Sequence, residues 1–475
     1  MRAFNSIIYR TCGSMNQFQR FKKARLWQHA QRLWLTTSSR IVIEERPLEK
    51  QRPSKIYLWE GKNRTWNVTS ADSIDKKESS SSRMNTIEQS MLHRYVINHF
   101  LPANYPKSVA DGYGRFASYC FIASVAGSAS MVLSTQTLLL AIGVFGQQTS
   151  ASIMAGALNW VLKDGIGQLG GIGFASFMGR STSQFDANPK YWRMVAALSL
   201  DAATLLEITS PLVPSNLVLP IASVANIGKN IGFLTASASR AALHQALAKT
   251  GNLGDVTAKA GSQSMAASLF GTALGIGMTP LLADVPHFIM GYVFLSLAHQ
   301  TFNFLSLKAV PLAHFNFERL DLVLKAYILS ERKVLSPADV AAEEMFFSLT
   351  PRFNNKTEKW LKIGGSVQML GGPEACKKML FSGNIVKPYV LVRNNNIYHL
   401  GFVTEATSSQ VIQGMYHAYC LHYKKIDQFC DGEKEDEALE RFNKFALCLT
   451  EKGWDLTAIR IEPTDAVRLS VSKKD

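Results

Sequence analysis

The feature that most constrains this chain is a long segment, Phe116 to Leu307, in which charged residues are rare. Its first 47 residues, Phe116 to Leu162, contain no Asp, Glu, Lys or Arg. Two further uncharged runs, Ala260–Ala283 and Val285–Leu307, are separated only by Asp284. About 20 apolar residues suffice to cross a bilayer as an α-helix. The sequence therefore predicts a mainly α fold built on a polytopic α-helical membrane domain, with lipid rather than water around its uncharged helices.

The net charge of +15 is concentrated before this segment. Residues 1–115 carry 20 Lys or Arg and nine Asp or Glu, whereas residues 116–310 carry nine and six, and residues 311–475 carry 22 and 21. A nucleic-acid-binding protein needs its basic surface on a folded domain, so we expect no nucleic-acid partner. The six cysteines are scattered and lack metal-ligand spacing, so we expect no metal and no cofactor.

Residues 1–43 have the composition of an organellar transit peptide. They contain eight Lys or Arg and no Asp or Glu, and their apolar residues recur at roughly helical spacing. We predict import, with the mitochondrion preferred to the plastid; the alternative is a basic tail or a helix lying on an anionic membrane surface. Residues 44–97 form a polar region. It contains a predicted hairpin at Lys55–Val68, a Ser-rich linker at Thr69–Arg83 and the start of a predicted helix at Met84–Phe100.

Several separate motifs follow one another in residues 98–350. They are FLPANYPKSV (100–109), WVLKDGIGQLGGIGFA (160–175), NPKYWRMVAALSLDAATLLEITSPLVP (188–214), NIGKNIGFLTASASRAALHQ (226–245) and NLGDVTAKAGSQSMAASLFG (252–271). Together they resemble the root UVB-sensitive (RUS) family of eukaryotes. The resemblance implies a membrane-associated helical domain, here residues 98–310, in plastids, mitochondria or other membranes. It also implies a link to vitamin B6 homeostasis, UV-B-sensitive root growth and auxin transport, and it carries over no catalytic residue, so we expect no enzyme.

Ionisable residues inside the apolar segment are candidates for function, because a charge in hydrocarbon is costly unless it is paired or faces water. Asp201 and Glu207 are six residues apart, about 240° around a helix, so they do not form an obvious acid–base pair. We predict instead that a set of charged residues lines a solute cavity suited to small anions. The set comprises Lys163, Asp164, Lys229, Arg240 and Lys259, with Asn226, Asn230 and Gln263 as polar neighbours. The alternative is that these charges mark helix ends or neutralise one another.

Glycines and prolines predict how the helices pack and where they end. The pairs Gly167/Gly171 and Gly271/Gly275 have the small-xxx-small spacing that lets helices approach closely in lipid. The same region matches a dinucleotide fingerprint at 165–170, which we reject because no strand precedes it. Prolines 211, 214 and 220 indicate a broken or re-entrant segment, which transporters use for binding, or a plain interhelical loop. His287 and His299, on the last apolar run, are expected to be packing residues and not metal ligands.

The C-terminal third, residues 311–475, changes character and predicts a small soluble α+β domain. Helices are expected at Phe315–Leu329, Pro337–Leu349, 408–424 and 433–451, a hairpin at Pro388–Val403, and strands at Leu456–Ile461 and Ala466–Val471. No nucleophile elbow, phosphate loop or metal-ligand spacing is present. We therefore expect this domain to regulate the protein or to bind a protein partner.

The leading hypothesis is a non-enzymatic organellar membrane protein whose body handles a small anionic metabolite. The first alternative is a membrane-anchored scaffold or interaction protein, in which the charged residues of the body form internal pairs. A soluble helical enzyme is the other alternative, although consecutive uncharged runs of this length are unusual in soluble folds.

Overall fold

The computed structural model describes residues 40–45, 55–60, 65–70, 99–141, 150–179, 183–282, 284–330, 333–345, 360–382, 385–424, 432–461 and 467–470. The chain forms two compact units, Met1–His93 and Arg94–Asp475. The predicted Ser-rich linker, nearly all of the predicted transit peptide and most of the predicted helix at 84–100 lie outside the described residues.

The first unit contains a three-stranded antiparallel sheet in the order β1-β2-β3. Strands β2 (Lys55–Glu60) and β3 (Thr65–Ser70) pair with Trp59 opposite Trp66, which confirms the predicted hairpin. Strand β1 (Arg40–Glu45) pairs with β2 along its whole length and was not predicted. Its sequence RIVIEE begins at Arg40, inside the basic segment 1–43. The composition of that segment predicts an organellar targeting peptide, which is why no strand is predicted there.

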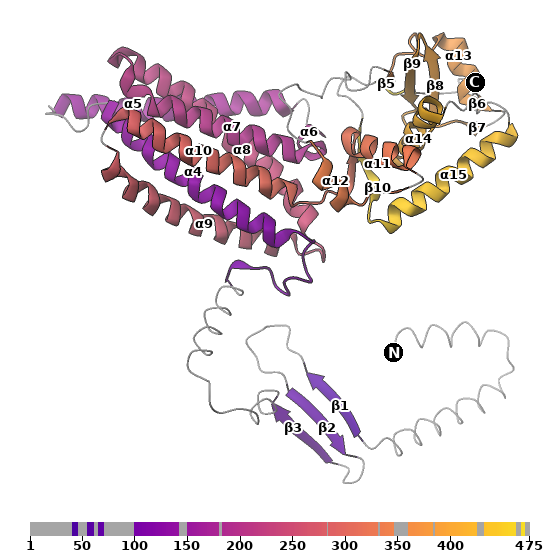
Figure 1. The fold of residues 1–475 in the computed structure, drawn as a ribbon, viewed down its shortest axis with the longest axis horizontal. Helices are drawn as coiled ribbons and strands as arrows, with labels where there is room; N and C mark the ends of the chain where they lie inside the picture. Colours follow the sequence, from indigo (N-terminus) through magenta and orange to yellow (C-terminus); the bar gives the residue numbers. More distant parts are fainter. Residues whose placement is uncertain are drawn as a thin grey trace. The chain divides into compact units, whose positions relative to one another are not determined.

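The second unit begins with a bundle of long helices (Figure 1). They are α4 (Tyr113–Ala141), α5 (Ser150–Met178), α7 (Pro189–Ile208), α8 (Ser215–Leu247), α9 (Leu253–Met278) and α10 (Val285–Lys308), with a short α6 (Ser183–Ala187) before α7. Within the described residues, five helical segments are long and apolar enough to cross a membrane: Tyr113–Ala141, Pro189–Leu212, Ser215–Leu247, Leu253–Leu281 and Val285–Lys308. The expected mainly α architecture is confirmed.

Helices α8 and α4 organise the bundle. Helix α8 packs against both α5 and α7, and α4 packs against α7, α9 and α10. Glycines permit these contacts: a Cβ on Gly271 would come within 2.6 Å of Ser128 Cβ on α4, and one on Gly167 within 2.7 Å of Asn226 Cγ on α8. The predicted close packing at the small-xxx-small positions is therefore confirmed, and the rejected dinucleotide motif lies inside the continuous helix α5.

The prolines of the central segment mark an interhelical connection. Helix α7 ends at Ile208, a 3₁₀ turn, η4, covers Ser210–Leu212, and α8 begins at Ser215. Pro220 lies inside α8 without ending it, in its second turn. The segment is therefore broken, as predicted, and the break is the plain interhelical loop that was the alternative to a transporter-like site. Pro211 and Pro214 occupy this connection, where they cost no helical hydrogen bond.

The isolated Asp284 also has a local structural role. Asp284 is the N-cap of α10, and its Oδ1 accepts a hydrogen bond from the backbone nitrogen of His287 at 3.1 Å. This bond satisfies one of the amide donors that a helix start leaves unpaired. A second 3₁₀ turn, η5 (Thr279–Leu281), precedes this cap. The two uncharged runs are thus two helices joined by a tight connection.

Large apolar side chains cover the outer faces of the bundle. In the span Leu253–Leu281, only 17% of the most apolar window is buried within the protein. The exposed apolar side chains of the bundle include Val161, Leu169 and Phe177 on α5, Met265, Leu269 and Phe270 on α9, and Met290 and Phe294 on α10. Soluble proteins rarely expose contiguous apolar surfaces of this kind, whereas lipid chains cover them without cost.

The remainder of the unit combines helices with short strands. The helices are α11 (Phe317–Leu329), α12 (Pro337–Glu343), α13 (Gly372–Leu380), α14 (Ser408–Lys424) and α15 (Gly432–Glu451). The strands are β4 (His314–Asn316), β5 (Leu361–Ile363), β6 (Phe381–Ser382), β7 (Ile385–Val386), β8 (Tyr389–Asn394), β9 (Ile397–Phe402) and β10 (Asp455–Arg460).

These elements share one hydrophobic core that reaches from Phe315 to Leu469. Strand β9 pairs with β5 in parallel and with β8 in antiparallel, and β4 pairs with β10 in parallel. Asn395 and Asn396 have φ of 46° and 66°, the left-handed conformations that a two-residue hairpin turn requires. The predicted hairpin and the two long helices after it are confirmed. Of the predicted strand at Ala466–Val471, residues 467–470 are described, and there Leu469 forms one bridge with Val403.

Candidate functional site

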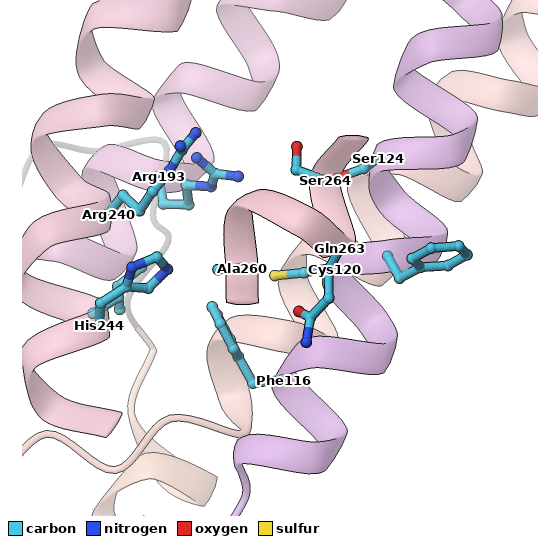
Figure 2. A pocket seen from close by; sticks show the side chains of 11 residues that line it. Phe116, Cys120, Ser124, Arg193, Arg240, His244, Ala260, Gln263 and Ser264 are labelled. Atoms are coloured by element: carbon cyan, nitrogen blue, oxygen red, sulfur yellow. The ribbon is translucent and has the colours of Figure 1, made fainter. Parts of the chain in front are cut away.

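The strongest candidate site is a pocket between four helices of the bundle (Figure 2). It encloses about 580 Å³ of unfilled space, part of it open to the surroundings. It is lined by Phe116, Cys120, Phe121 and Ser124 of α4, Arg193 of α7, Arg240, Leu243 and His244 of α8, and Ala260, Gln263 and Ser264 of α9. These residues lie within about three turns of the starts of α4, α7 and α9 and the end of α8. The pocket therefore sits toward one end of the bundle.

Two arginines form one side of this pocket. Figure 2 shows Arg193 and Arg240 near each other, with Cys120 and Gln263 across the space from them. Arg193 is partly buried and its Nη1 donates to the backbone oxygen of Ala236 at 3.3 Å, while Arg240 lies exposed at the open side. Like charges this close repel each other. A bound anion would offset this repulsion.

Neither arginine is neutralised within the described part of the chain. No carboxylate there forms an ion pair with Arg193 or Arg240, in contrast to the buried lysines of the bundle, Lys163, Lys190 and Lys229. The opposite side of the pocket offers neutral hydrogen-bonding groups. Gln263 Nε2 donates to the backbone oxygen of Phe100 at 2.6 Å and lies 3.4 Å from the Tyr113 hydroxyl. The pocket thus combines unpaired guanidinium groups, neutral polar groups and the apolar wall of Phe116 and Leu243.

Lys229 does not share this pocket with Arg240. The two residues are 11 positions apart on α8, about 16 Å along the helix axis. Lys229 Nζ donates to the Glu207 carboxylate, which also accepts from the Ser134 hydroxyl, and all three side chains are buried. The predicted cavity residue Lys229 is therefore neutralised by Glu207, and the prediction that it lines an anion cavity with Arg240 is wrong.

The remaining predicted cavity residues also lie elsewhere. Lys163 Nζ pairs with Asp164 Oδ1 at 2.8 Å on α5 and lies 4.6 Å from the centroid of the Trp160 ring. Asn226 donates to Asp164 Oδ1 at 3.2 Å, which ties this pair to α8. Lys259 precedes the lining residue Ala260 but does not itself line the pocket. Of the five predicted residues, only Arg240 lines the pocket, and Lys163, Asp164 and Lys229 form ion pairs elsewhere.

Sequence reasoning found Arg240 and Gln263 but missed Arg193. Arg193 stands four residues after the proline that starts α7, directly beside aromatic residues. An arginine in such a place ordinarily extends to the membrane interface. Its only distinguishing signal is that no acidic residue lies within a helical turn of it. The lack of a nearby acidic residue indicates a ligand site only once α7 and α8 are known to pack together, because that packing brings Arg193 and Arg240 into one pocket.

A second polar cluster surrounds Asp201, deeper in the bundle. Its carboxylate accepts hydrogen bonds from Ser296 Oγ at 2.7 Å, His299 Nδ1 at 2.8 Å and Gln300 Nε2 at 2.7 Å, all on α10. The Tyr292 hydroxyl donates to the backbone oxygen of Asp201 at 2.6 Å. His299 is therefore held by hydrogen bonding, as predicted, and Asp201 and Glu207 belong to separate clusters.

A third cluster joins the start of α7 to the C-terminal elements. Glu344 accepts from Lys190 Nζ and from Arg319 Nε, each at 2.9 Å, and all three residues are buried. Burial alone would raise the pKa of Glu344, but Arg319 and Lys190 hold that pKa below its usual range. Burial, together with Arg319 and Arg460, lowers the pKa of His314 to about 4. His314 therefore adds no positive charge to this junction at neutral pH.

Comparison with known proteins identifies relatives for most of the bundle. Residues 86–331 match a family model described as the vitamin B6 photo-protection and homoeostasis domain. The chain is 33% identical to protein root UVB sensitive 3 of Arabidopsis thaliana over 252 residues, 53% of this chain and 56% of that protein. It is 28% identical to protein root UVB sensitive 2, chloroplastic, of the same plant over 378 residues, 78% and 83% of the two chains.

The match extends beyond plants. The chain is 29% identical to RUS family member 1 of Dictyostelium discoideum over 284 residues, 59% of this chain and 53% of that protein. The chain thus spans little more than half the length of two of these three relatives. No solved structure matches it. The matched region contains every residue that lines the pocket.

Proposed function

This chain belongs to the root UVB sensitive (RUS) family, and on that premise we propose that it is a polytopic membrane protein that binds a small anionic metabolite between Arg193 and Arg240. The observation that carries this function is the pair of guanidinium groups that face one pocket and meet no carboxylate in the described residues. Guanidinium groups bind phosphate and carboxylate oxygens through parallel charge-assisted hydrogen bonds. Such a ligand would neutralise the charge that the fold leaves unpaired.

The pocket suits an anion that carries a ring. Phe116 and Leu243 provide an apolar wall, and Gln263 and His244 offer polar contacts near it. Ligand sites commonly combine an apolar lining with a few polar groups. The matched family model is named for vitamin B6, whose phosphorylated forms join a flat pyridine ring to a phosphate. We therefore choose pyridoxal 5′-phosphate as the first ligand to test.

The protein works in this account without catalysis, in a membrane, with residues 311–475 as a soluble α+β domain that binds a protein partner. The exposed apolar faces of the bundle support the membrane location. One relative is named as chloroplastic, which gives the mitochondrion no preference over the plastid. The organelle therefore stays a prediction from the N-terminal composition.

A membrane-anchored scaffold is the second candidate function. The internal pairs Lys163–Asp164 and Lys229–Glu207 favour it, because they neutralise charges that a solute cavity would have used. The two candidates differ in one respect. A scaffold has no need to bind a small anion, whereas the proposed function requires it.

Calorimetric binding to the full-length protein in detergent or nanodiscs tests the proposal. Arg193→Gln and Arg240→Gln should each weaken binding of pyridoxal 5′-phosphate by about tenfold or more, since a hydrogen bond to a charged group contributes about 1.5–3 kcal/mol. Arg193→Lys and Arg240→Lys, which keep the charge, should lose less. Lys163→Gln, on α5 and outside the pocket, is the matched control and should bind normally.

The neutral vitamer pyridoxine should bind far more weakly than the phosphate ester. Equal binding by the wild-type protein and both Arg→Gln variants would show that the pocket is not the site. Absence of anion binding by a correctly folded wild-type protein would favour the scaffold.

A further inference from the structure

The Asp201–His299 pair lies near the middle of two candidate membrane spans. Asp201 follows the first residue of the span Pro189–Leu212 by 12 positions, about 18 Å along the helix. His299 follows the first residue of the span Val285–Lys308 by 14 positions, about 21 Å. The hydrocarbon core of a bilayer is about 30 Å thick. The pair is therefore placed where an ionisable group is most costly and, by default, functional.

The hydrogen bonds of the cluster fix which nitrogen of His299 can take up a proton. The side chains of His299 and Asp201 are 14% and 11% exposed. A carboxylate only accepts hydrogen bonds, so Nδ1 of His299 carries the hydrogen that it donates to Asp201. Nε2 is then the basic nitrogen. In the described residues it has no hydrogen-bond partner, and the ring faces Gly127 of α4, where even a methyl group would lie 3.5 Å from Nε2.

Other charged groups on the neighbouring helices already have roles. Helices α4, α8 and α10 pack against α7. On α10, the groups facing Asp201 are Ser296, Gln300 and the titratable Tyr292. On α8, Lys229 is paired with Glu207 of α7, while Arg240 and His244 line the pocket with Arg193. The only charged residue of α4 is Arg115, 12 positions before Gly127. No second carboxylate or lysine contacts the pair within the described residues.

We propose that the Asp201–His299 pair is a proton-binding site inside the membrane body and that its proton is linked to the anion in the Arg193–Arg240 pocket. A hydronium ion transfers its proton to the lone pair of His299 Nε2 and is released as water, and the resulting imidazolium stays paired with the Asp201 carboxylate. One O–H bond of the donor breaks, one N–H bond forms, and no other covalent bond changes. The proton site stands on its own geometry, and only the link to the anion rests on the proposed function.

The linkage follows from the spacing along α7. Arg193 and Asp201 are eight residues apart, about 12 Å along the axis. At that distance, with an effective dielectric constant of about 20, one unit charge changes the affinity for an opposite charge by about tenfold. Anion binding should therefore favour proton uptake at His299, and protonation should favour anion binding by the same factor.

Nuclear magnetic resonance of the full-length protein, labelled with ¹⁵N at histidine, tests the proton site without any anion. The resonance lost in His299→Gln identifies the imidazole. Spectra are recorded between about pH 8 and 5, the range in which histidine ordinarily changes charge. As the sample is acidified, a proton should add at Nε2 while Nδ1 keeps its hydrogen. A His299 resonance that shows no proton at Nε2 anywhere in this range would overturn the proposal.

Calorimetry with sulfate, which stays a dianion over the same range, tests the link. Titrations in buffers of different ionisation enthalpy report how many protons accompany binding. The wild-type protein should take up protons with sulfate, and His299→Gln should bind sulfate with that uptake lost. The matched control is His287→Gln, which removes a second histidine–aspartate pair that is exposed at the start of α10 and should leave the uptake unchanged.

These outcomes separate the two proposals. Proton uptake that is the same in His299→Gln as in the wild-type protein would overturn the linkage. Absence of sulfate and pyridoxal 5′-phosphate binding, with a His299 that titrates, would reject the anion pocket and leave the proton site standing.

Discussion

Four charged residues on α7 have different surroundings, and these surroundings decide their roles. Lys190 and Glu207 are buried in ion pairs, and Asp201 is held by three donors from α10. Arg193 donates to a backbone oxygen and lies beside another arginine, with no ion pair to any described carboxylate. Burying a charge without a partner is costly, so partners are the rule in a protein interior. The exception, Arg193, is therefore the residue whose surroundings indicate a ligand.

At this scale, removal of the Glu344 carboxylate should be strongly destabilising. Glu344→Gln removes the carboxylate that pairs with both Lys190 and Arg319, and breaking a buried pair costs about 3–5 kcal/mol. Thermal unfolding of the purified full-length chain measures the loss. Glu343→Gln, at the exposed neighbouring position, is the matched control and should change little. Equal stability of the two variants would contradict the conclusion that Glu344 pairs with Lys190 and Arg319 in a buried cluster.

The same carboxylate predicts a pH dependence. The fold holds the pKa of Glu344 below its usual range. The contribution of this carboxylate to the free energy of unfolding is therefore fully present above the unfolded pKa of about 4.3, and it is lost as the pH falls through the folded pKa. The stability difference between the wild-type protein and Glu344→Gln should therefore be constant near neutrality and shrink in acid. A difference that grows as the pH falls would contradict this sign.

At the scale of helices and strands, close packing between α4 and α9 depends on glycine. Gly271→Ala places a methyl group within 2.6 Å of Ser128 Cβ and 3.2 Å of the Ala129 backbone nitrogen, so the helices must move apart. Overpacking of this kind costs about 1–3 kcal/mol. Gly261→Ala, on the same helix, meets nothing within 4 Å and should be neutral or stabilising. Unfolding temperatures in one detergent compare the two variants, and equal values would contradict the packing.

The elements themselves were largely predictable, because their signals are local. Uncharged runs, the hairpin asparagines and the N-cap residues Asp284 and Ser336 each act within a few positions of the chain. The site was less predictable for the opposite reason. Arg193 and Arg240 are 47 residues apart, and the other walls of their pocket come from α4 and α9. Which helices become neighbours depends on packing that one sequence does not display.

The charged residues show the same limit. Lys229 and Arg240 share helix α8, yet Lys229 is neutralised by Glu207, whereas Arg240 forms no ion pair with a described residue. The difference is the position of Glu207, six residues after Asp201 on α7. Spacing along one helix did not predict these partners on the next helix, and the partners set the chemistry.

At the scale of the whole molecule, the pocket and the junction with the C-terminal elements lie toward the same end of α7. Lys190, in the junction, and Arg193, in the pocket, are three residues apart, about one helical turn. Exposed apolar side chains cover the outer faces of α5, α9 and α10. Under the proposed function, the protein is a lipid-embedded helical body with a cationic pocket near one end and C-terminal elements joined to that end.

An experimental density map of the full-length protein in lipid nanodiscs, at saturating pyridoxal 5′-phosphate, tests this account most directly. We expect a lipid belt around the exposed apolar faces of α9 and α10, and phosphate density between the Arg193 and Arg240 guanidinium groups. Phosphate density elsewhere, or a carboxylate of the chain seated between the two arginines, would contradict the central claim.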